Sequence, residues 1–285
     1  MLWFFDAVAH GFRYPTDPAR IQLFRIIYGT VLTIRFALAF GQGGWDRLAL
    51  GSLTTFVTEK RYGPTRTRLL VAVYRPMLIV RTLAACALAA GLVPRLALLP
   101  VLAGIAMELL YLKSPNAVRF ALLTGICLLL AGDLGTGLHL MHGSSTANTW
   151  AQCLLVLLAT DIYWNSAWQK LRSPQFRSGL YLAQWIHTYS QVREHLRHRR
   201  QFAVPGLVRR HAGNLTDRDI RLWRGVAATV IAAEIALPPA LLIPAATPYA
   251  IGAGIAMHAA FTCLKPVQLI TFSGITLATY VTFFA

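Results

Sequence analysis

The run IQLFRIIYGTVLTIRFALAF, residues 21–40, decides the fold class. At about 1.5 Å per residue, a helix of this length spans roughly 30 Å, which is the thickness of the hydrocarbon core of a bilayer. Comparable apolar runs follow near residues 70–91, 95–112, 117–132, 149–170, 225–243, 247–263 and 267–285. We therefore predict an all-α fold, a polytopic integral membrane bundle of about eight transmembrane helices.

Composition and charge agree with this class. Of the 285 residues, 56% are hydrophobic and 13% are charged, whereas about a quarter of the residues of a soluble domain are charged. These values exclude a disordered chain, a collagen-like fibre and an ordinary soluble enzyme. The net charge of +16 comes without a basic domain interleaved with aromatic residues, so we expect no nucleic-acid partner.

Lys and Arg are concentrated in alternate loops. The segments 41–68, 113–119 and 171–224 are basic, whereas 133–148 and 244–248 contain neither Lys nor Arg. By the positive-inside rule, the basic loops are cytoplasmic and both termini lie outside. We predict a multi-pass protein of the cell membrane, with a bacterial inner or plasma membrane as the expected location and the lipid bilayer as a partner.

We expect a single domain over 1–285, with two segments outside the spans. Residues 1–20 form an amphipathic lead-in that lacks the basic region and cleavage site of a signal peptide. In the 171–224 segment, apolar residues of FRSGLYLAQWIHTYSQV (176–192) recur every two to four positions. This spacing predicts an interfacial amphipathic helix with its aromatic face towards lipid, followed by a basic stretch that contacts anionic headgroups.

Ionisable residues lie inside the apolar runs, where a charge facing lipid costs about 2.5–3.5 kcal/mol at mid-span. The set comprises Arg25, Arg35, Arg81, Glu108, Asp161, Glu234 and His258. We expect these side chains to face the bundle and to pair. The sequence does not determine which arginine meets which carboxylate, and for the arginines a structural role and a functional role are equally open.

The run at 149–170 is the richest in polar residues. Asp161, Asn165 and Gln169 are four residues apart and share one helix face, while Tyr163 and Lys170 share a neighbouring face. Lys170 has two interpretations, a lysine that snorkels from the end of a span, or a buried lysine whose free amine acts as a base. Composition alone favours the first.

Two later runs contain one ionisable residue each. Glu234 precedes Pro238 and Pro239, where a kink would free backbone carbonyls to line a cavity. His258 is interpreted as a hydrogen-bonded packing residue, because no further ligands for a metal ion are found near it. The four cysteines lie singly in apolar runs, so we expect neither a disulfide nor a metal site.

Three stretches resemble the vitamin K-dependent γ-carboxylase and its bacterial relatives, the HTTM (horizontally transferred transmembrane) family. The most specific is YWNSAWQKLRSPQFRSGLYL (163–182), with its Lys-Leu pair, polar turn, aromatic residue and glycine. IQLFRIIYGTVLTIRF is similar to the family's first-helix segment, and EIALPPALLIP with IAMHAAFTCLKPVQLITFSG is similar to its late pair of helices. The chain departs from the carboxylase pattern at Trp168, where a small residue is usual, and at Gln169, where a second lysine is found.

The resemblance implies a membrane-embedded, quinol-dependent enzyme that acts on a peptide or a small lipidic substrate. In the carboxylases, the lysine that matches Lys170 deprotonates vitamin K hydroquinone. Oxygen then converts the quinol into a base strong enough to remove a glutamate γ-proton, carbon dioxide adds to the carbanion, and the quinone leaves as its epoxide. The implied cofactor is thus a reduced naphthoquinone of the vitamin K or menaquinol type, with oxygen and carbon dioxide as co-substrates.

The implied site has two catalytic residues, Lys170 and His258. The expected substrate and cofactor pocket comprises Asp161, Tyr163, Asn165 and Glu234, and the expected structural ion pairs involve Arg25, Arg35, Arg81 and Glu108. The alternative is a non-enzymatic membrane component for the maturation, immunity or export of a secreted peptide, similar to the sporulation-delaying protein B group, whose members act with a small soluble partner. In that alternative, Lys170 is replaceable and the cationic 193–210 segment is not.

Overall fold

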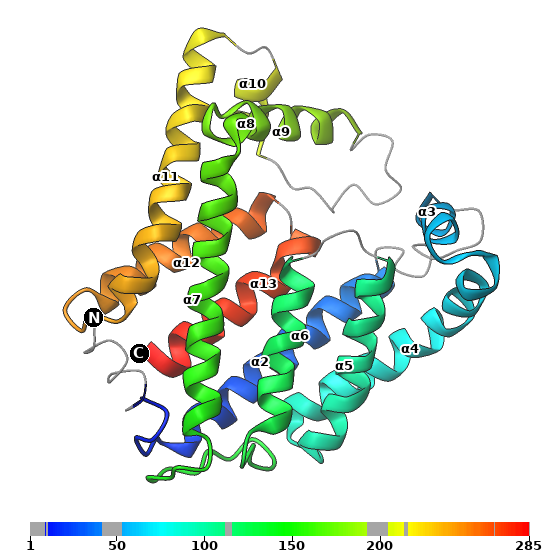
Figure 1. Cartoon of the computed structure of the whole chain (residues 1–285), viewed down its shortest axis with the longest axis vertical. Helices are drawn as coiled ribbons and strands as arrows, with labels where there is room; N and C mark the ends of the chain where they lie inside the picture. Colours follow the sequence, from blue (N-terminus) through cyan, green and yellow to red (C-terminus); the bar gives the residue numbers. More distant parts are fainter. Residues whose placement is uncertain are drawn as a thin grey trace. The chain divides into compact units, whose positions relative to one another are not determined.

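The computed structural model of this chain is all-helical (Figure 1). It describes residues 9, 11–41, 53–111, 116–192, 205–213, 216–264 and 266–284. No β-strand occurs within these ranges, although Thr16 and Ser145 form an isolated antiparallel bridge. The prediction of an all-α class is confirmed.

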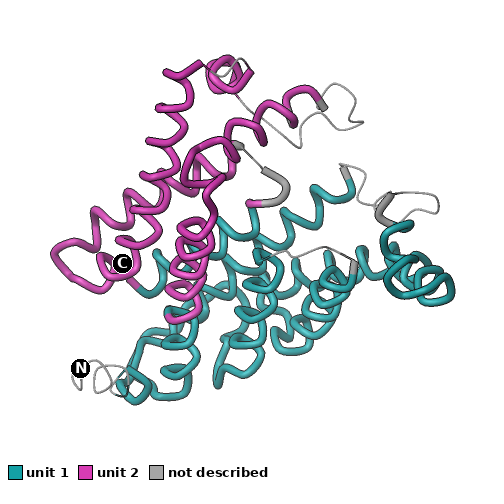
Figure 2. Tube along the Cα trace, turned by 45° about the horizontal axis from the view of Figure 1, so that its top comes forward, with its two compact units in different colours: residues 1–156, 270–283 teal, residues 157–269, 284–285 magenta. Residues whose placement is uncertain are grey.

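The chain divides into two compact units, residues 1–156 with 270–283 and residues 157–269 with 284–285 (Figure 2). The boundaries fall inside helices α7 (Thr149–Arg172) and α13 (Pro266–Thr279), not in loops. The single domain expected over 1–285 stays a prediction.

In the first unit, long helices pack in chain order, α2 against α4, α4 against α5 and α5 against α6. Their bounds are Pro18–Gly41 for α2, Pro64–Ala90 for α4, Pro94–Tyr111 for α5 and Asn116–Leu130 for α6. A short helix, α3 (Leu53–Tyr62), lies in a stretch that the sequence predicted as a loop. Most of α13 and the π-helix η2 (Tyr280–Phe284) also belong to this unit.

One face of α2 forms the centre of the core of this unit. Its fully buried hydrophobic side chains, three or four residues apart, are Ile21, Phe24, Tyr28, Leu32 and Phe36. Between them, Gly29 lies so close to α4 that a Cβ atom there would be 2.6 Å from the backbone nitrogen of Ala89. A residue without a side chain is what allows the two helix backbones to approach this closely.

Helix α4 ends at a glycine for two reasons. Gly91 has φ 72°, a left-handed conformation that favours glycine. Its amide donates to the carbonyl of Leu88 at 3.1 Å, and the amide of Leu92 donates to the carbonyl of Ala87 at 2.8 Å, the two bonds of a Schellman motif. A Cβ atom at Gly91 would also collide with the backbone of Gly137, so the loop after α6 packs directly on this helix end.

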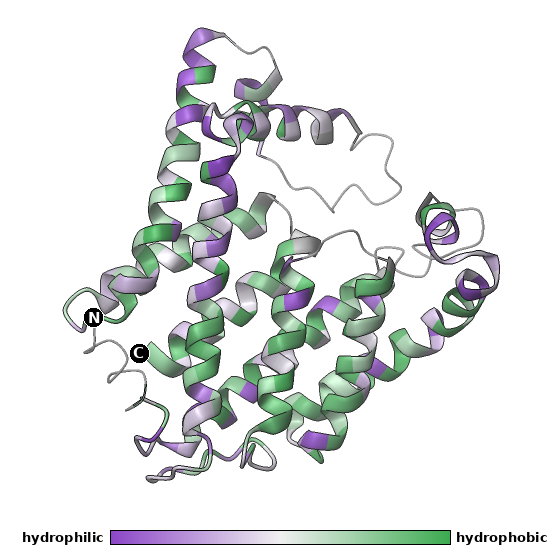
Figure 3. Ribbon diagram, viewed as in Figure 1, coloured by the Kyte–Doolittle hydropathy of each residue, from purple (hydrophilic) through white to green (hydrophobic). Residues whose placement is uncertain are grey.

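The second unit is built from the part of α7 that follows Val156 and from helices α8 to α12. Their bounds are Pro174–Arg177 for α8, Leu180–Val192 for α9, Gly206–Gly213 for α10, Asp217–Leu241 for α11 and Thr247–Leu264 for α12. Helix α9 contacts α8, α10 and α11, and α11 packs against α12. Hydrophilic residues gather on α9, α10 and the first turns of α11 (Figure 3).

The amphipathic helix predicted at 176–192 corresponds to α8 and α9, but its apolar face is turned towards protein. Ala183 and Ile186 form a buried cluster with Trp223 of α11. Phe176 packs against α11 at Ile231. The prediction that this face turns to lipid is therefore wrong for these residues, because the amino-terminal part of α11 covers it.

Helix α11 begins before the apolar run that predicted it. The Thr216 hydroxyl accepts from the amide of Asp219, and the Asp219 carboxylate accepts from the amide of Thr216, which is a capping box. His211 of α10 lies 2.7 Å from the same carboxylate. The hydrogen bonds from Thr216 and then from His211 lower the pKa of Asp219 to about 2.

Each of the apolar runs predicted to span the membrane coincides with a helix, namely α2, α4, α5, α6, α7, α11, α12 and α13 with η2. By length and composition, Pro18–Phe40 and Pro64–Ala90 are long and apolar enough to cross a membrane. The number of spans and their orientation stay predictions.

Candidate functional site

A lysine, a serine and a glutamate meet in the second unit. Ser166 and Lys170 are four residues apart on α7 and therefore share one face, which meets Glu234 of α11. The Lys170 Nζ atom forms an ion pair with Glu234 Oε1 and also donates to Ser166 Oγ at 2.6 Å. Ser166 Oγ donates in turn to Glu234 Oε1 at 3.1 Å.

The two carboxylate oxygens of Glu234 have different surroundings. Oε1 accepts from both Lys170 and Ser166, whereas Oε2 is buried and has no hydrogen-bond partner among the described residues. The Glu234 side chain is 4% exposed and that of Lys170 is 21% exposed. The ring of Phe176 lies 5.6 Å from the Lys170 Nζ atom. An unsatisfied buried oxygen is rare in folded proteins and marks a place for a donor.

These contacts bear on the expected role of Lys170. A general base needs an unprotonated amine, but a carboxylate in contact stabilises the ammonium form. In the geometry described here, Lys170 acts as a donor in both of its hydrogen bonds. The sequence analysis expected Glu234 in the pocket without naming its partner. Ser166 was not among the expected site residues, although its position four residues before Lys170 was a usable signal.

The second pair of this unit joins α7 to α12. The phenol oxygen of Tyr163 and Nε2 of His258 are hydrogen-bonded, and both side chains are almost completely buried. The edge of the Phe261 ring also meets His258, with centroids 6.1 Å apart. Tyr163 and Ser166 are three residues apart, so the two polar clusters follow one another along the inner face of α7.

The polar stripe of α7 lies on the other side of the helix. Asp161, Asn165 and Gln169 are exposed, and the Gln169 amide donates to Asn165 Oδ1 at 3.0 Å. The structure thus brings Tyr163 and Glu234 to the buried side of α7 but does not bring Asp161 and Asn165 there. The reason is helix geometry. Side chains two positions apart in a helix are separated by about 200° around its axis, so Asp161 points away from Tyr163.

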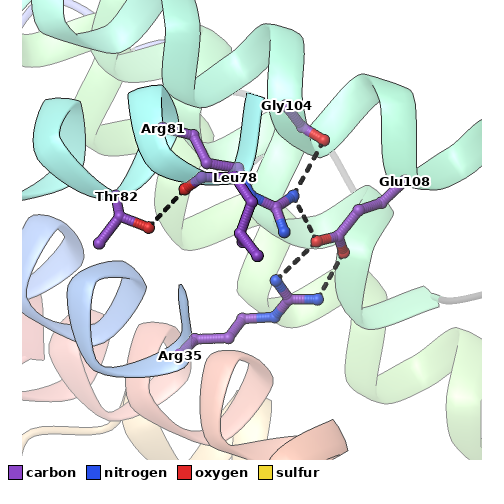
Figure 4. Close-up of polar contacts among 6 residues, drawn as sticks. All are labelled: Arg35, Leu78, Arg81, Thr82, Gly104 and Glu108. Atoms are coloured by element: carbon purple, nitrogen blue, oxygen red, sulfur yellow. Dashed lines mark hydrogen bonds and ion pairs between the residues drawn. The ribbon is translucent and has the colours of Figure 1, made fainter. Parts of the chain in front are cut away.

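The first unit contains a separate charged cluster, in which two arginines share one carboxylate (Figure 4). Arg35 of α2 binds Glu108 of α5 with both terminal nitrogens, one of them at 2.8 Å from Oε1. Arg81 of α4 donates to Glu108 Oε1 at 2.5 Å and to the carbonyl of Gly104 at 3.2 Å. The Phe36 ring lies 5.5 Å from the Arg35 guanidinium and 4.4 Å from that of Arg81. The cluster joins three helices of the unit.

Arg25 differs from the expected ion pair. Its guanidinium is fully buried and donates to backbone carbonyls: Leu134 at 2.9 Å, Leu88 at 2.5 Å, Ala89 at 3.3 Å and Gly137 at 2.6 Å. The carbonyls of the last turn of α4 lack the amides of a following helical turn, so they can accept from a cation, and that of Leu88 accepts from both Arg25 and the amide of Gly91. Arg25 thus connects α2, the end of α4 and the loop after α6.

Within the described ranges, no group of three or more His, Cys, Asp or Glu side chains is placed to hold a metal ion. No protein-family model matches the chain, and no curated protein or solved structure matches it significantly.

Proposed function

We propose that this chain is a polytopic membrane enzyme of the quinol-dependent, HTTM type, with the Lys170–Ser166–Glu234 cluster as its acid–base site. The observation that carries the proposal is the ion pair of Lys170 with Glu234. It joins two of the stretches that resemble the carboxylase family, 163–182 and 234–244, through charged groups on apolar helices. Charged residues in such helices mark functional sites by default, because placing them there is costly.

The proposal includes eight spans with the basic loops in the cytoplasm. It is supported by the apolar helices and by the distribution of Lys and Arg among the loops. Single cysteines placed at Gly143 and Arg177 in a cysteine-free background test it. The cysteine at Gly143 should react with an impermeant maleimide in intact cells, and the one at Arg177 only after permeabilisation. The opposite pattern would reverse the topology, and equal labelling would overturn the span count.

One feature of the cluster suits a reduced naphthoquinone as ligand. Glu234 Oε2 is a buried acceptor without a donor, and a quinol presents a hydroxyl group to such an acceptor. When bound, the quinol would supply the chemistry of oxygen activation, with conversion of quinol and oxygen to epoxide and water. The chain itself would bind the hydroxyl group at Glu234, hold the carboxylate through Lys170 and Ser166, and keep water away.

Oxygen and carbon dioxide as co-substrates, and a peptide or small lipidic molecule as the carboxylated or modified substrate, are further parts of the proposal. They follow from the resemblance alone. Tyr163 and its partner His258 of α12 would form the inner wall of the same site, because Tyr163 lies on the same face of α7 as Ser166.

The test is epoxide formation by the purified protein in lipid nanodiscs. Menadiol, a short reduced naphthoquinone, would be added with oxygen, and the epoxide measured by mass spectrometry. Lys170→Met, which removes the partner of Glu234, should reduce the rate at least about 100-fold, within the range for a lost acid–base group. Asp161→Asn, an exposed change on the same helix, should leave it unchanged. A wild-type protein that forms no epoxide and binds no menadiol would overturn the proposal.

A non-enzymatic role in the maturation, immunity or export of a peptide is the second candidate, and one observation favours it. Exposed arginines gather at the end of the second unit formed by α8, α10 and the first turns of α11, at Arg177, Arg209, Arg210, Arg218, Arg221 and Arg224. Such a surface fits an acidic partner. In this case, serine substitutions at these arginines would abolish the biological effect, and Lys170→Met would preserve it. Of the expected docking segment 193–210, residues 193–204 lie outside the described residues.

A further inference from the structure

The inference concerns which group of the Lys170–Ser166–Glu234 cluster takes the proton, and it rests on the proposed function. The hydrogen bonds are unevenly distributed. Lys170 and Ser166 both donate to Oε1 of Glu234, and Ser166 also accepts from Lys170. Oε2 of the same carboxylate receives nothing from the described residues and is buried.

Two donors of the Lys170 ammonium and the Ser166 hydroxyl are thus engaged within the cluster, whereas one carboxylate oxygen has no donor among the described residues. An ammonium group has three donors and no acceptor, so Lys170 cannot take a proton while it remains charged. The Ser166 hydroxyl already donates to Glu234 and accepts from Lys170. The position where an incoming O–H group can be bound and deprotonated is Oε2 of Glu234.

We propose that Glu234 is the proton acceptor of this site and that Lys170 is a positioning residue that holds the carboxylate. In the step, the O–H bond of the bound quinol hydroxyl breaks and an O–H bond forms at Glu234 Oε2. The electron pair of the broken bond remains on the quinol oxygen. Lys170 keeps its three protons, and no electron is transferred in this step.

The charge balance of the cluster favours this assignment. With Lys170 as ammonium and Glu234 as carboxylate, the pair is neutral before the proton moves, and the total charge is the same afterwards. A neutral Lys170 amine beside a charged Glu234 would instead leave an uncompensated carboxylate among apolar helices. Isolated buried charge of this kind is costly.

The same geometry favours a neutral ligand that presents a hydrogen-bond donor. An anion would meet the Glu234 carboxylate, and a cation would compete with Lys170 for it. The apolar surroundings include Phe176 and the side chain of Ile231, which pack together beside the cluster. A quinol satisfies these conditions, since an apolar ring system carries its hydroxyl groups.

Two substitutions separate the two possible bases. Arginine does not lose its proton in proteins, so Lys170→Arg keeps a cation beside Glu234 but cannot act as a base. Glu234→Gln keeps the shape and an acceptor for Lys170 but removes the proton acceptor. We expect Lys170→Arg to form menadiol epoxide within about tenfold of the wild-type rate and Glu234→Gln to lose at least about 100-fold. Asp161→Asn is the matched control on α7.

A second measurement does not depend on turnover. Without oxygen, infrared difference spectra on adding menadiol should show the carbonyl stretch of a newly protonated carboxyl group in the wild type, in Lys170→Arg and in Asp161→Asn. Glu234→Gln should lack this band. It should also bind menadiol about 10- to 100-fold more weakly, the loss expected for one hydrogen bond to a charged acceptor.

The outcomes distinguish the inference from the function on which it rests. An active wild type with an inactive Lys170→Arg and no carboxyl band would overturn the assignment of Glu234 and make Lys170 the base. An active wild type with an active Glu234→Gln would do the same. A wild type that neither binds menadiol nor forms epoxide would overturn the proposed function and this inference with it.

Discussion

Replacing Glu108 by glutamine is expected to destabilise the first unit by about 3 kcal/mol. The carboxylate is shared by Arg35 and Arg81, and the side chains of Arg81 and Glu108 are only 2% and 3% exposed. Removing one partner of a buried ion pair costs about 3–5 kcal/mol, because the other charge is left without compensation. Glutamine retains one oxygen that can accept from a guanidinium, and Arg35 is more exposed, which places the value at the lower end.

The assay is reversible unfolding in mixed detergent micelles, followed by circular dichroism as the fraction of denaturing detergent rises. Glu59→Gln is the matched control, because Glu59 is an exposed carboxylate on α3, and it should change the free energy of unfolding by less than about 0.5 kcal/mol. A triple variant with Met at Arg35 and Arg81 and Leu at Glu108 should be more stable than Glu108→Gln, since no charge is left unpaired. The reasoning is refuted if Glu108→Gln loses less than about 1 kcal/mol, or if the triple variant loses the most.

Three further results are expected. Arg25→Met should lower the free energy of unfolding by at least about 2 kcal/mol and make the loop 131–148 more accessible to protease, because the guanidinium is one of the links between this loop and the end of α4; unchanged digestion would argue against this role. Gly91→Ala should cost more than about 1 kcal/mol, since the left-handed φ and the contact with Gly137 both oppose a Cβ atom, and an unchanged melting curve would contradict this. Asp219→Asn should lower the melting temperature at pH 6. The pKa of Asp219 is about 2 in the folded protein and near 4 in the unfolded chain, so its carboxylate stabilises the fold above about pH 4 and this contribution is lost as the pH falls through about 2. The difference in melting temperature between Asp219→Asn and the wild type should therefore vanish towards about pH 2, as thermal melts across this range would show.

The sequence predicted the helices better than their ends. Apolar runs located each long helix, because hydropathy marks the part of a helix that is apolar on all sides. It missed the polar first turns of α11, which a capping box at Thr216 and Asp219 adds before the run. It also missed α3, whose residues carry Lys and Arg and resemble a loop in composition.

The candidate site was predicted only in part, and the reason lies in its partners. Helical spacing alone predicted that Lys170 and Tyr163 lie near one face of α7, because residues seven apart always share a helix face. That Lys170 meets Glu234 on α11 depends on how α7 and α11 pack, which no periodicity encodes. Within the part of the chain that the structure describes, the expected ion pair of Arg25 is absent for a related reason. A buried guanidinium can donate to backbone carbonyls, which every sequence supplies, so no particular acidic residue has to be its partner.

The most direct test of the quinol chemistry is the mass of the product formed under isotopically heavy oxygen. Wild-type protein in nanodiscs would receive menadiol and the labelled gas, and the epoxide would be isolated and weighed by mass spectrometry beside a protein-free sample. We expect an epoxide that carries a heavy oxygen atom, formed by the wild type and not by Lys170→Met. Absence of the labelled epoxide, or its formation at the same rate in the protein-free sample, would contradict the proposal that this chain is a quinol-dependent membrane enzyme.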